Sequence, residues 1–269
     1  LAREGYSVLV IDSSSRDKIG KKPCGEGLFQ HCLFERSRSI GKTIKLVAVG
    51  SPVRIRISSN GRVNEIAQLN YRVLMIDRHK TIMNLLDKTT KLGGDVLFEH
   101  RVIRPIIRGG RVAGVLTRGN KGKEEDFYGR VIVDASGFNG ILRRSLPSMF
   151  PEPDFRDYEY AIAFREYIKV LNKKNDVEVI FDPNSLRGGY FWFFPRGEEA
   201  NVGAGSIKAH LADPRKLPTL VRYYLNGLNI RFNVSYLQAF APLPARRPFA
   251  FLAGEGILLI GDAGSLTNP

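Results

Sequence analysis

The chain has 269 residues, enough for one large domain or two of ordinary size. Hydrophobic residues make up 43% and charged residues 25%, which excludes a disordered chain, a collagen-like repeat and a disulfide-rich miniprotein. The formal net charge of +14 favours anionic partners, such as phosphorylated ligands or an anionic membrane surface; an ordinary solvated basic surface is the alternative. The basic residues form no polybasic block, which argues against nucleic acid, and no stretch reaches the ~20 apolar residues of a membrane-spanning helix.

The first residues predict the second half of a nucleotide-binding βαβ unit. Residues 1–5 are typical of the last turn of a helix with a glycine at its end, and residues 6–12 of a buried strand that ends in Asp12. In a dinucleotide-binding unit an acid at this place binds the ribose hydroxyls, and a glycine-rich phosphate loop lies about 20 residues earlier. We therefore expect the chain to be an internal portion of a longer protein, cut at both ends.

The rest of the chain predicts helices and many short strands. The expected helices are 77–92 and 216–225, and the expected strands are 44–57, 96–99, 102–107, 112–117, 126–128, 131–134, 160–168, 177–181, 190–194, 201–207, 231–240 and 256–260. Alternating strands and helices followed by many strands predict an α/β domain with an inserted antiparallel sheet. We expect the α/β domain to comprise residues 1–48, 69–146 and 246–269, and the β-rich domain to comprise residues 49–68 and 147–245.

Three predicted strands end in an acid that is followed by small residues. Besides Asp12, these acids are Asp134, which precedes Gly137 by three positions, and Asp262 in the segment Gly261-Asp262-Ala263. An acid and a tight turn at the end of a buried strand provide a place where a cofactor can approach closely. Each one alone is compatible with an ordinary strand-to-helix turn.

The segment from Tyr190 to Pro195 is unusually aromatic. Strand alternation places Tyr190, Trp192 and Phe194 on one face. These side chains would form either a wall for a large apolar ligand or part of a sheet core, and we favour the wall because Gly203 and Gly205 follow in the next strand.

Cysteine and histidine usage gives one candidate reactive residue and no metal site. Cys24 lies on a loop between Pro23 and Gly25, where it is either a small buried residue or a thiol near a reactive centre. Cys32 lies in an apolar, helix-like context and is expected to be inert. The four histidines are scattered, so neither a metal centre nor a hydrolase triad is indicated.

Taken together, these motifs resemble the geranylgeranyl reductase family within the flavin-hydroxylase-like fold. The motifs shared with many flavoproteins are Asp12, Asp77-Arg78, Asp134-x-x-Gly137 and Gly261-Asp262-Ala263-Gly264. The motifs that narrow the resemblance are Pro23-Cys24-Gly25-x-Gly27, Tyr190-x-Trp192-x-Phe194-Pro195 and Asn201-Val202-Gly203-x-Gly205. The resemblance implies an α/β fold: an FAD-binding Rossmann-like domain with an inserted antiparallel β-sheet substrate domain.

The resemblance also implies residue roles around FAD. Asp12 would bind the adenosine ribose, and Val102 would lie at the adenine edge. Arg78 would contact the phosphate region, and Asp262 the ribityl or pyrophosphate part. The flavin side would be lined by Cys24, Gly25 and Gly27, with Asp134 and Gly137 in the turn that the cofactor approaches. Cys24 is the candidate catalytic residue, and Tyr190, Trp192 and Phe194 are the candidate substrate-binding residues.

The implied function is an FAD-dependent reductase that saturates double bonds of geranylgeranyl chains in membrane-lipid precursors. The implied partners are an isoprenoid lipid or prenyl diphosphate and an electron donor, either NADPH or a ferredoxin-like protein, with no nucleic acid. The expected location is the cytoplasm, with peripheral contact at a membrane surface left open. The alternatives are a flavin-dependent monooxygenase or halogenase, an electron-transfer flavoprotein–quinone oxidoreductase, and a non-catalytic lipid-binding module on the same fold.

Overall fold

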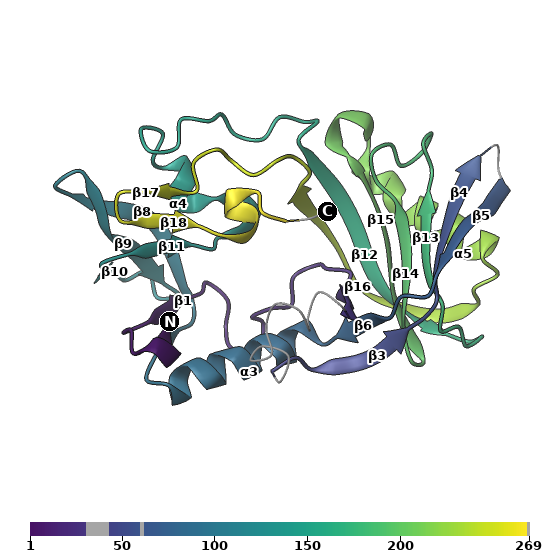
Figure 1. Cartoon of the computed structure of the whole chain (residues 1–269), viewed down its shortest axis with the longest axis horizontal. Coiled ribbons are helices and arrows are strands. Elements are labelled where there is room, and N and C mark those ends of the chain that lie inside the picture. The colour runs from purple at the N-terminus through teal and green to yellow at the C-terminus, as the bar shows by residue number, and fades with distance from the viewer. Residues whose placement is uncertain (31–42, 60–61, 268–269) are drawn as a thin grey trace. The chain divides into compact units, whose positions relative to one another are not determined.

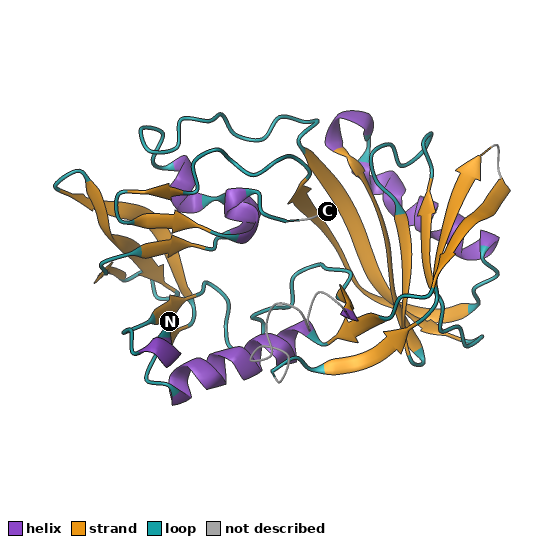
Figure 2. Cartoon of the chain, in the orientation of Figure 1, coloured by secondary structure: helices purple, strands orange, loops and turns teal. Residues whose placement is uncertain are grey.

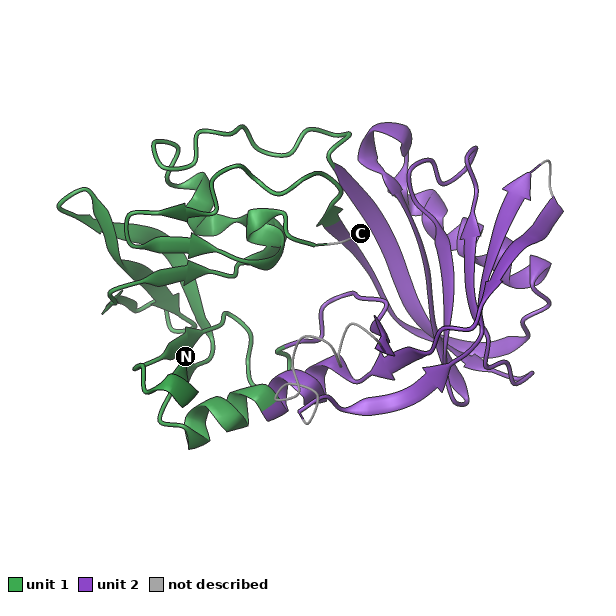
Figure 3. Cartoon of the chain, viewed as in Figure 1, with its two compact units in different colours: residues 1–19, 85–159, 243–269 green, residues 20–84, 160–242 purple. Residues whose placement is uncertain are grey.

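The computed structural model describes residues 1–30, 43–59 and 62–267 (Figure 1). Two compact units are present, each built from separate pieces of the chain (Figure 3). Unit 1 contains residues 1–19, 85–159 and 243–269, and unit 2 contains residues 20–84 and 160–242. Residues 20–30, 43–48 and 69–84 thus belong to the same unit as the large sheet, although their motifs predict that they belong with the nucleotide-binding segments. Residues 147–159, in turn, pack in unit 1.

Unit 1 combines parallel strand pairs with an antiparallel meander. Strand β1 (Leu9–Ile11) pairs in parallel with β7 (Asp95–Leu97), and β11 (Ile132–Asp134) pairs in parallel with β18 (Ile257–Leu259). The short β17 (Ala253–Gly254) completes the second sheet. The meander consists of β8 (His100–Arg108), β9 (Arg111–Gly119) and β10 (Glu124–Tyr128), and its first turn uses Gly109 and Gly110 at positive φ.

Short helices close unit 1 around a small apolar core. They are α4 (Ile141–Arg144) and the 3₁₀ turns η1 (Ala2–Glu4), η2 (Gly137–Asn139) and η5 (Gly261–Gly264). The core draws on the meander, on α4 and on β18; its buried members are Val112, Val115, Leu142, Leu146, Phe150, Ile257 and Leu259. The carboxyl ends of β11 and β18 therefore lie side by side above this core.

Unit 2 is dominated by a seven-stranded sheet (Figure 2). The strands, in spatial order, are β16 (Phe232–Pro244), β12 (Tyr160–Val170), β15 (Glu199–Ile207), β14 (Phe191–Arg196), β13 (Val177–Phe181), β4 (Val53–Ser59) and β5 (Arg62–Leu69). The pairs β12–β15, β15–β14, β14–β13 and β4–β5 are antiparallel, whereas β13 and β4 run parallel. A second, three-stranded sheet has the order β2 (Gly27–Phe29), β6 (Val73–Ile76) and β3 (Leu46–Gly50).

One face of the large sheet is covered by helix α5 (Leu217–Gly227). The helix presents an apolar stripe at spacings of four, seven and eight residues, formed by Leu217, Val221, Tyr224 and Leu225. These residues share one core with Phe191 and Phe193 of β14 and with apolar residues on the same face of β12 and β15. The remaining elements of unit 2 are the turns η3 (Lys208–His210) and η4 (Pro214–Lys216), while α3 (Arg78–Lys91) begins in unit 2 and ends in unit 1. Among the residues that the structure describes, no helix is long and apolar enough to cross a membrane.

Candidate functional site

Three neighbouring strands of unit 2 align two rows of side chains on the sheet face opposite α5. Strand register places these residues directly across from one another on β12, β15 and β14. We call them the platform: Tyr167, Asn201 and Phe194 in one row, and Arg165, Gly203 and Trp192 in the next. Gly203 lies under the indole of Trp192, because a Cβ at this position would be 2.2 Å from Cζ2 of the ring. The missing side chain therefore lets the indole lie flat on the sheet.

Residues 22–27, which we call the Cys24 loop, lie on this platform. Gly25 is packed against Phe194 so closely that a Cβ on Gly25 would be 2.9 Å from Cε2 of the ring. A Cβ on Gly27 would be 3.1 Å from the same ring atom. Side chains of the platform also bind the loop backbone, since Arg165 donates to the carbonyl oxygen of Lys22 at 3.4 Å. The Cys-Gly-x-Gly loop and the aromatic strand, far apart in the sequence, thus form one packed cluster.

Asn201 connects the loop to the aromatic strand. Its side chain is fully buried, and its Nδ2 donates to the carbonyl oxygen of Cys24 at 2.7 Å. Its Oδ1 accepts a hydrogen bond from Nε1 of Trp192 at 3.0 Å. A buried amide with both ends bonded avoids the free-energy cost of an unsatisfied polar group.

Glu26 holds the other side of the loop. Its backbone has a φ of 60°, which is rare for a residue with a side chain. Its carboxylate accepts hydrogen bonds from the hydroxyl of Tyr167 at 2.6 Å and from Arg196 at 2.7 Å. The same Arg196 nitrogen donates to the carbonyl oxygen of Ile76 at 2.8 Å. The carboxylate is 9% exposed, so these charge-assisted bonds are well shielded from water and can hold the strained backbone.

The Cys24 thiol is free and half-buried. Its Sγ accepts a weak hydrogen bond from the backbone N–H of Glu26 at 3.4 Å. Burial raises the pKa of Tyr190, and a neighbouring Cys24 charge raises that pKa further, so the two ionisable groups lie near each other. Tyr190 also extends the aromatic row: its ring centroid is 6.1 Å from that of Trp192, which is 6.3 Å from that of Phe194. Trp192 is 8% exposed, whereas Tyr190 and Phe194 are only half-buried.

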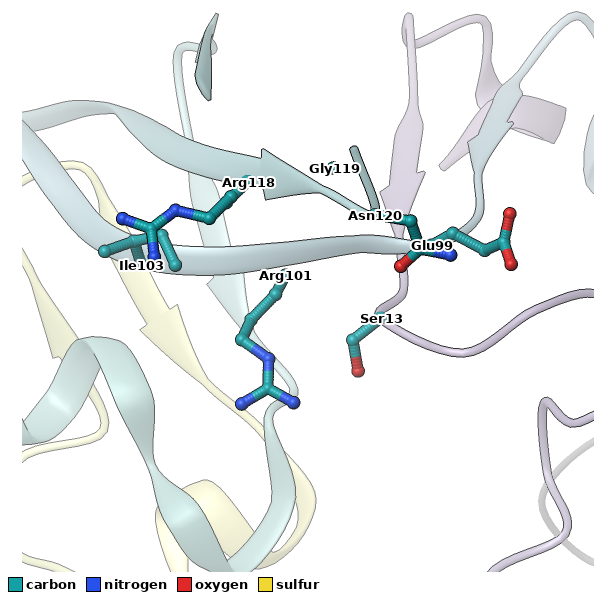
Figure 4. Close-up of a pocket in the computed structure, with 7 residues that line it drawn as sticks. All are labelled: Ser13, Glu99, Arg101, Ile103, Arg118, Gly119 and Asn120. Atoms are coloured by element: carbon teal, nitrogen blue, oxygen red, sulfur yellow. The ribbon is translucent and has the colours of Figure 1, made fainter. Parts of the chain in front are cut away.

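In unit 1, Asp12 lies at the end of β1 beside a polar pocket. Oδ1 of Asp12 accepts a hydrogen bond from the backbone N–H of Ser14 at 2.7 Å. The backbone carbonyl oxygen of Asp12 accepts one from the backbone N–H of His100. The pocket has a volume of about 320 Å³ and is lined by Ser13, Glu99, Arg101, Ile103, Arg118, Gly119 and Asn120 (Figure 4). Arg118 pairs with Glu124, whereas the guanidinium of Arg101 has no partner among the described residues. Figure 4 shows the Glu99 carboxylate and the Arg101 guanidinium pointing in different directions.

The other two strand-end acids come together at the carboxyl ends of β11 and β18. Asp134 is 2% exposed, and its two oxygens accept three backbone N–H groups, those of Ser136, Leu142 and Arg143. This carboxylate therefore caps α4, and its predicted cofactor contact remains a prediction. Asp262 is half-buried in η5, where one oxygen accepts from the hydroxyl of Thr267. Turn η2, which begins at Gly137, packs against η5.

The remaining predicted residues are divided between the units. Arg78 begins α3 and is half-buried in unit 2, whereas Val102 lies on β8 of unit 1 at the margin of its core. Cys32 lies outside the described residues. The sequence predicted no role for Glu26, Tyr167, Arg165 or Arg196. Asn201 was recognised as part of a motif, but its hydrogen bonds were not predicted. The one feature of the sequence that could have indicated these contacts is the charged Glu26 between two glycines.

The bond from Tyr167 to Glu26 predicts a dependence of stability on alkaline pH. Burial and the Glu26 carboxylate raise the pKa of Tyr167 above the usual 10.0. An unfolded tyrosine loses its proton near that value, so above about pH 10 the unfolded state binds fewer protons than the native state and the free energy of unfolding falls. Tyr167→Phe removes this contribution. Urea titrations between about pH 8 and pH 11 should show a shallower fall for the variant, and parallel curves would contradict the expectation.

Comparison with known proteins identifies relatives over the whole chain. No family model matches the sequence. The chain is 29% identical to the digeranylgeranylglycerophospholipid reductase of Sulfolobus acidocaldarius, with 100% of this chain and 60% of the relative covered. It is 25% identical to the digeranylgeranylglycerophospholipid reductase 2 of Methanopyrus kandleri, with 100% and 67% covered. The chain thus spans about 60% of the length of the Sulfolobus relative.

Solved structures show the same fold. A geranylgeranyl bacteriochlorophyll reductase-like protein from Thermoplasma acidophilum aligns with a TM-score of 0.83 and 23% identity, covering 98% of this chain and 67% of that one. A myxobacterial chondrochloren halogenase, a variant of the FAD-dependent halogenases, aligns with a TM-score of 0.71 and 17% identity, covering 100% and 65%. The predicted fold class, a Rossmann-like domain of the FAD-binding type with an inserted sheet domain, is confirmed. The chain is therefore similar over its whole length to the digeranylgeranylglycerophospholipid reductases, and the predicted resemblance to the geranylgeranyl reductase family is confirmed.

Proposed function

We propose that the protein is an FAD-dependent reductase that saturates double bonds in the geranylgeranyl chains of membrane-lipid precursors. The observation that carries this proposal is the packing of the Cys24 loop on the aromatic strand, which brings a free thiol beside a row of aromatic rings in unit 2. The names of the relatives support the substrate class.

The residues of unit 1 fit the adenosine part of FAD. The half-buried carboxylate of Asp12 has one oxygen without a partner among the described residues, and such an oxygen can accept the ribose hydroxyls. Arg101 offers an unpaired guanidinium in the adjacent pocket. Gly261 has a φ of 56° and nothing within 4 Å of where a Cβ would lie, so its backbone is open to a close approach. We assign Val102 to the adenine edge, and Asp262 and Arg78 to the ribityl and phosphate parts, on the resemblance.

When bound, FAD in its reduced form supplies a hydride to one alkene carbon. The chain must hold a proton near the other carbon, because an isolated alkene is a poor electrophile. We assign this task to the Cys24 thiol, because it lies beside the aromatic row near Tyr190, whose hydroxyl is protonated at neutral pH as in any tyrosine. Tyr190, Trp192 and Phe194 line the isoprenoid chain, and their ring faces stabilise positive character that develops on it.

The excess of basic residues suits the anionic headgroup of such a precursor. A net charge of +14 also suits peripheral contact with an anionic bilayer. The electron donor, NADPH or a ferredoxin-like protein, would reduce the bound FAD.

Flavin content tests the cofactor assignment. The purified protein should be yellow and should release FAD rather than FMN on denaturation. Asp12→Ala should lower FAD occupancy, because the ribose loses its acceptor. The matched control is Asp95→Ala, which removes an exposed carboxylate at the opposite end of the paired strand β7 and should leave occupancy unchanged. Absorbance measures the FAD occupancy of each variant, and chromatography of the released flavin distinguishes FAD from FMN. Equal occupancy in the two variants would remove Asp12 from the site.

Replacement of the thiol tests the proton source. Cys24→Ala should slow alkene reduction by about 10²-fold or more, the usual range for a lost general acid. FAD occupancy should change little, since the carbonyl of Cys24 keeps its hydrogen bond from Asn201 and the carboxylate of Glu26 keeps its bond from Arg196. Cys32→Ala should affect neither quantity. Unchanged turnover of Cys24→Ala, measured where chemistry limits the rate, would assign the proton to another group.

Two neighbouring residues separate the substrate wall from the sheet core. Phe191 is fully buried against α5, so Phe191→Ala should cost about 3–5 kcal/mol of stability and leave chain-length preference unchanged. Tyr190 is half-buried on the opposite face, so Tyr190→Ala should cost less stability and reduce turnover of long prenyl chains more than short ones. Urea unfolding measures the stability of the two variants, and turnover of prenyl substrates of graded length measures their chain-length preference. An unchanged chain-length preference in Tyr190→Ala would contradict the wall.

A further inference from the structure

The buried amide of Asn201 has a fixed orientation. Trp192 Nε1 can only donate a hydrogen bond, so it must face the amide oxygen, and the carbonyl of Cys24 can only accept one, so it must face the amide nitrogen. Both partners lie within 3.0 Å of Asn201, and the side chain has no exposed surface. The indole packs on Gly203, where a side chain would collide with its ring. One rigid chain of contacts therefore runs from the sheet, through the indole and the amide, to the backbone of Cys24.

We propose that Asn201 is a positioning residue that holds Cys24 in the geometry required for proton delivery. This inference rests on the proposed function, in which the Cys24 thiol holds the proton. Asn201 does not touch the substrate; it acts through the carbonyl group of Cys24. Trp192 has a second task in this arrangement, because its Nε1 orients the amide.

The contacts on either side explain why this one bond controls the thiol. The next residue, Gly25, has no side chain to fix its own conformation, and a Cβ at this position would be 2.9 Å from the ring of Phe194. Glu26 fixes the far side of the loop through Tyr167 and Arg196. Without Asn201 the loop is held on one side by the weak bond from Arg165 to Lys22, and on the other side by Glu26 and the pairing of β2 with β6. The peptide that carries the thiol can rotate between these points. The expected loss is therefore local mobility at Cys24 rather than unfolding of the sheet.

The test uses Asn201→Asp in the full protein. Aspartate has nearly the same size and still accepts from Trp192, but its carboxylate cannot donate to the Cys24 carbonyl and repels it. The matched control is Ser206→Ala on the same strand, which removes a buried side-chain bond of 2.9 Å to a different loop, at Arg187. Trp192→Phe is a second variant, because it keeps an aromatic side chain on the platform and removes the indole N–H together with one ring of the indole. The probe is N-ethylmaleimide, with alkylation of Cys24 followed by peptide mass spectrometry.

Asn201→Asp should raise the alkylation rate of Cys24 about tenfold, Trp192→Phe should raise it by less, and Ser206→Ala should leave it unchanged. In turnover, Asn201→Asp should lower kcat about tenfold while KM changes less than about twofold, because the thiol is misplaced but the substrate wall is intact. Equal alkylation rates in Asn201→Asp and Ser206→Ala would overturn the proposal, as would a raised rate with an unchanged kcat. If the parent reduces no prenyl substrate, the proposed function fails, and the alkylation rates still decide whether Asn201 holds the loop.

Discussion

The arrangement of the candidate site in unit 2 depends on the attachment of one short loop to one sheet face. The Cys24 loop has little apolar surface of its own, since it contains two glycines, and it is held by hydrogen bonds from buried side chains. Such bonds are worth more inside the protein than at its surface, because the alternative is a buried polar group without a partner. The position of the thiol is therefore set by the bonds of Asn201 and Glu26, together with the packing of the two glycines on Phe194.

The same constraint explains the composition of the platform. Large rings need neighbours without side chains, so Trp192 lies over Gly203 and Phe194 lies under Gly25. The opposite sheet face has no such requirement and packs Phe191 and Phe193 against α5 as an ordinary core. Aromatic residues that alternate along one strand thus serve two different purposes, and the glycines mark which face is which.

Much of this organisation could be predicted from the sequence, because it follows from local pattern. Alternation placed Tyr190, Trp192 and Phe194 on one face, and the expected helix 77–92 is observed as α3 (Arg78–Lys91). Strands β2 and β6 gave no signal, since they have three and four residues and no alternation. The bonds of Asn201 and Glu26 could not be predicted, because they depend on the register of three strands and on contacts between distant parts of the chain. Asn201 and Cys24 are separated by 177 positions, and Tyr167 and Glu26 by 141 positions.

The discontinuous build of unit 2 also has a consequence for how the protein folds. The parallel pairing of β4 with β13 joins segments so distant that Arg54 and Asp176, which form an ion pair across it, are 122 positions apart. Contacts of this range close slowly, since the loop entropy must be lost before the pairing energy is gained. During synthesis the early residues emerge long before the strands that receive them. The thiol of Cys24 is therefore among the last groups to reach its native surroundings, and until then it is more exposed to oxidants and electrophiles than in the finished fold, where it is half-buried.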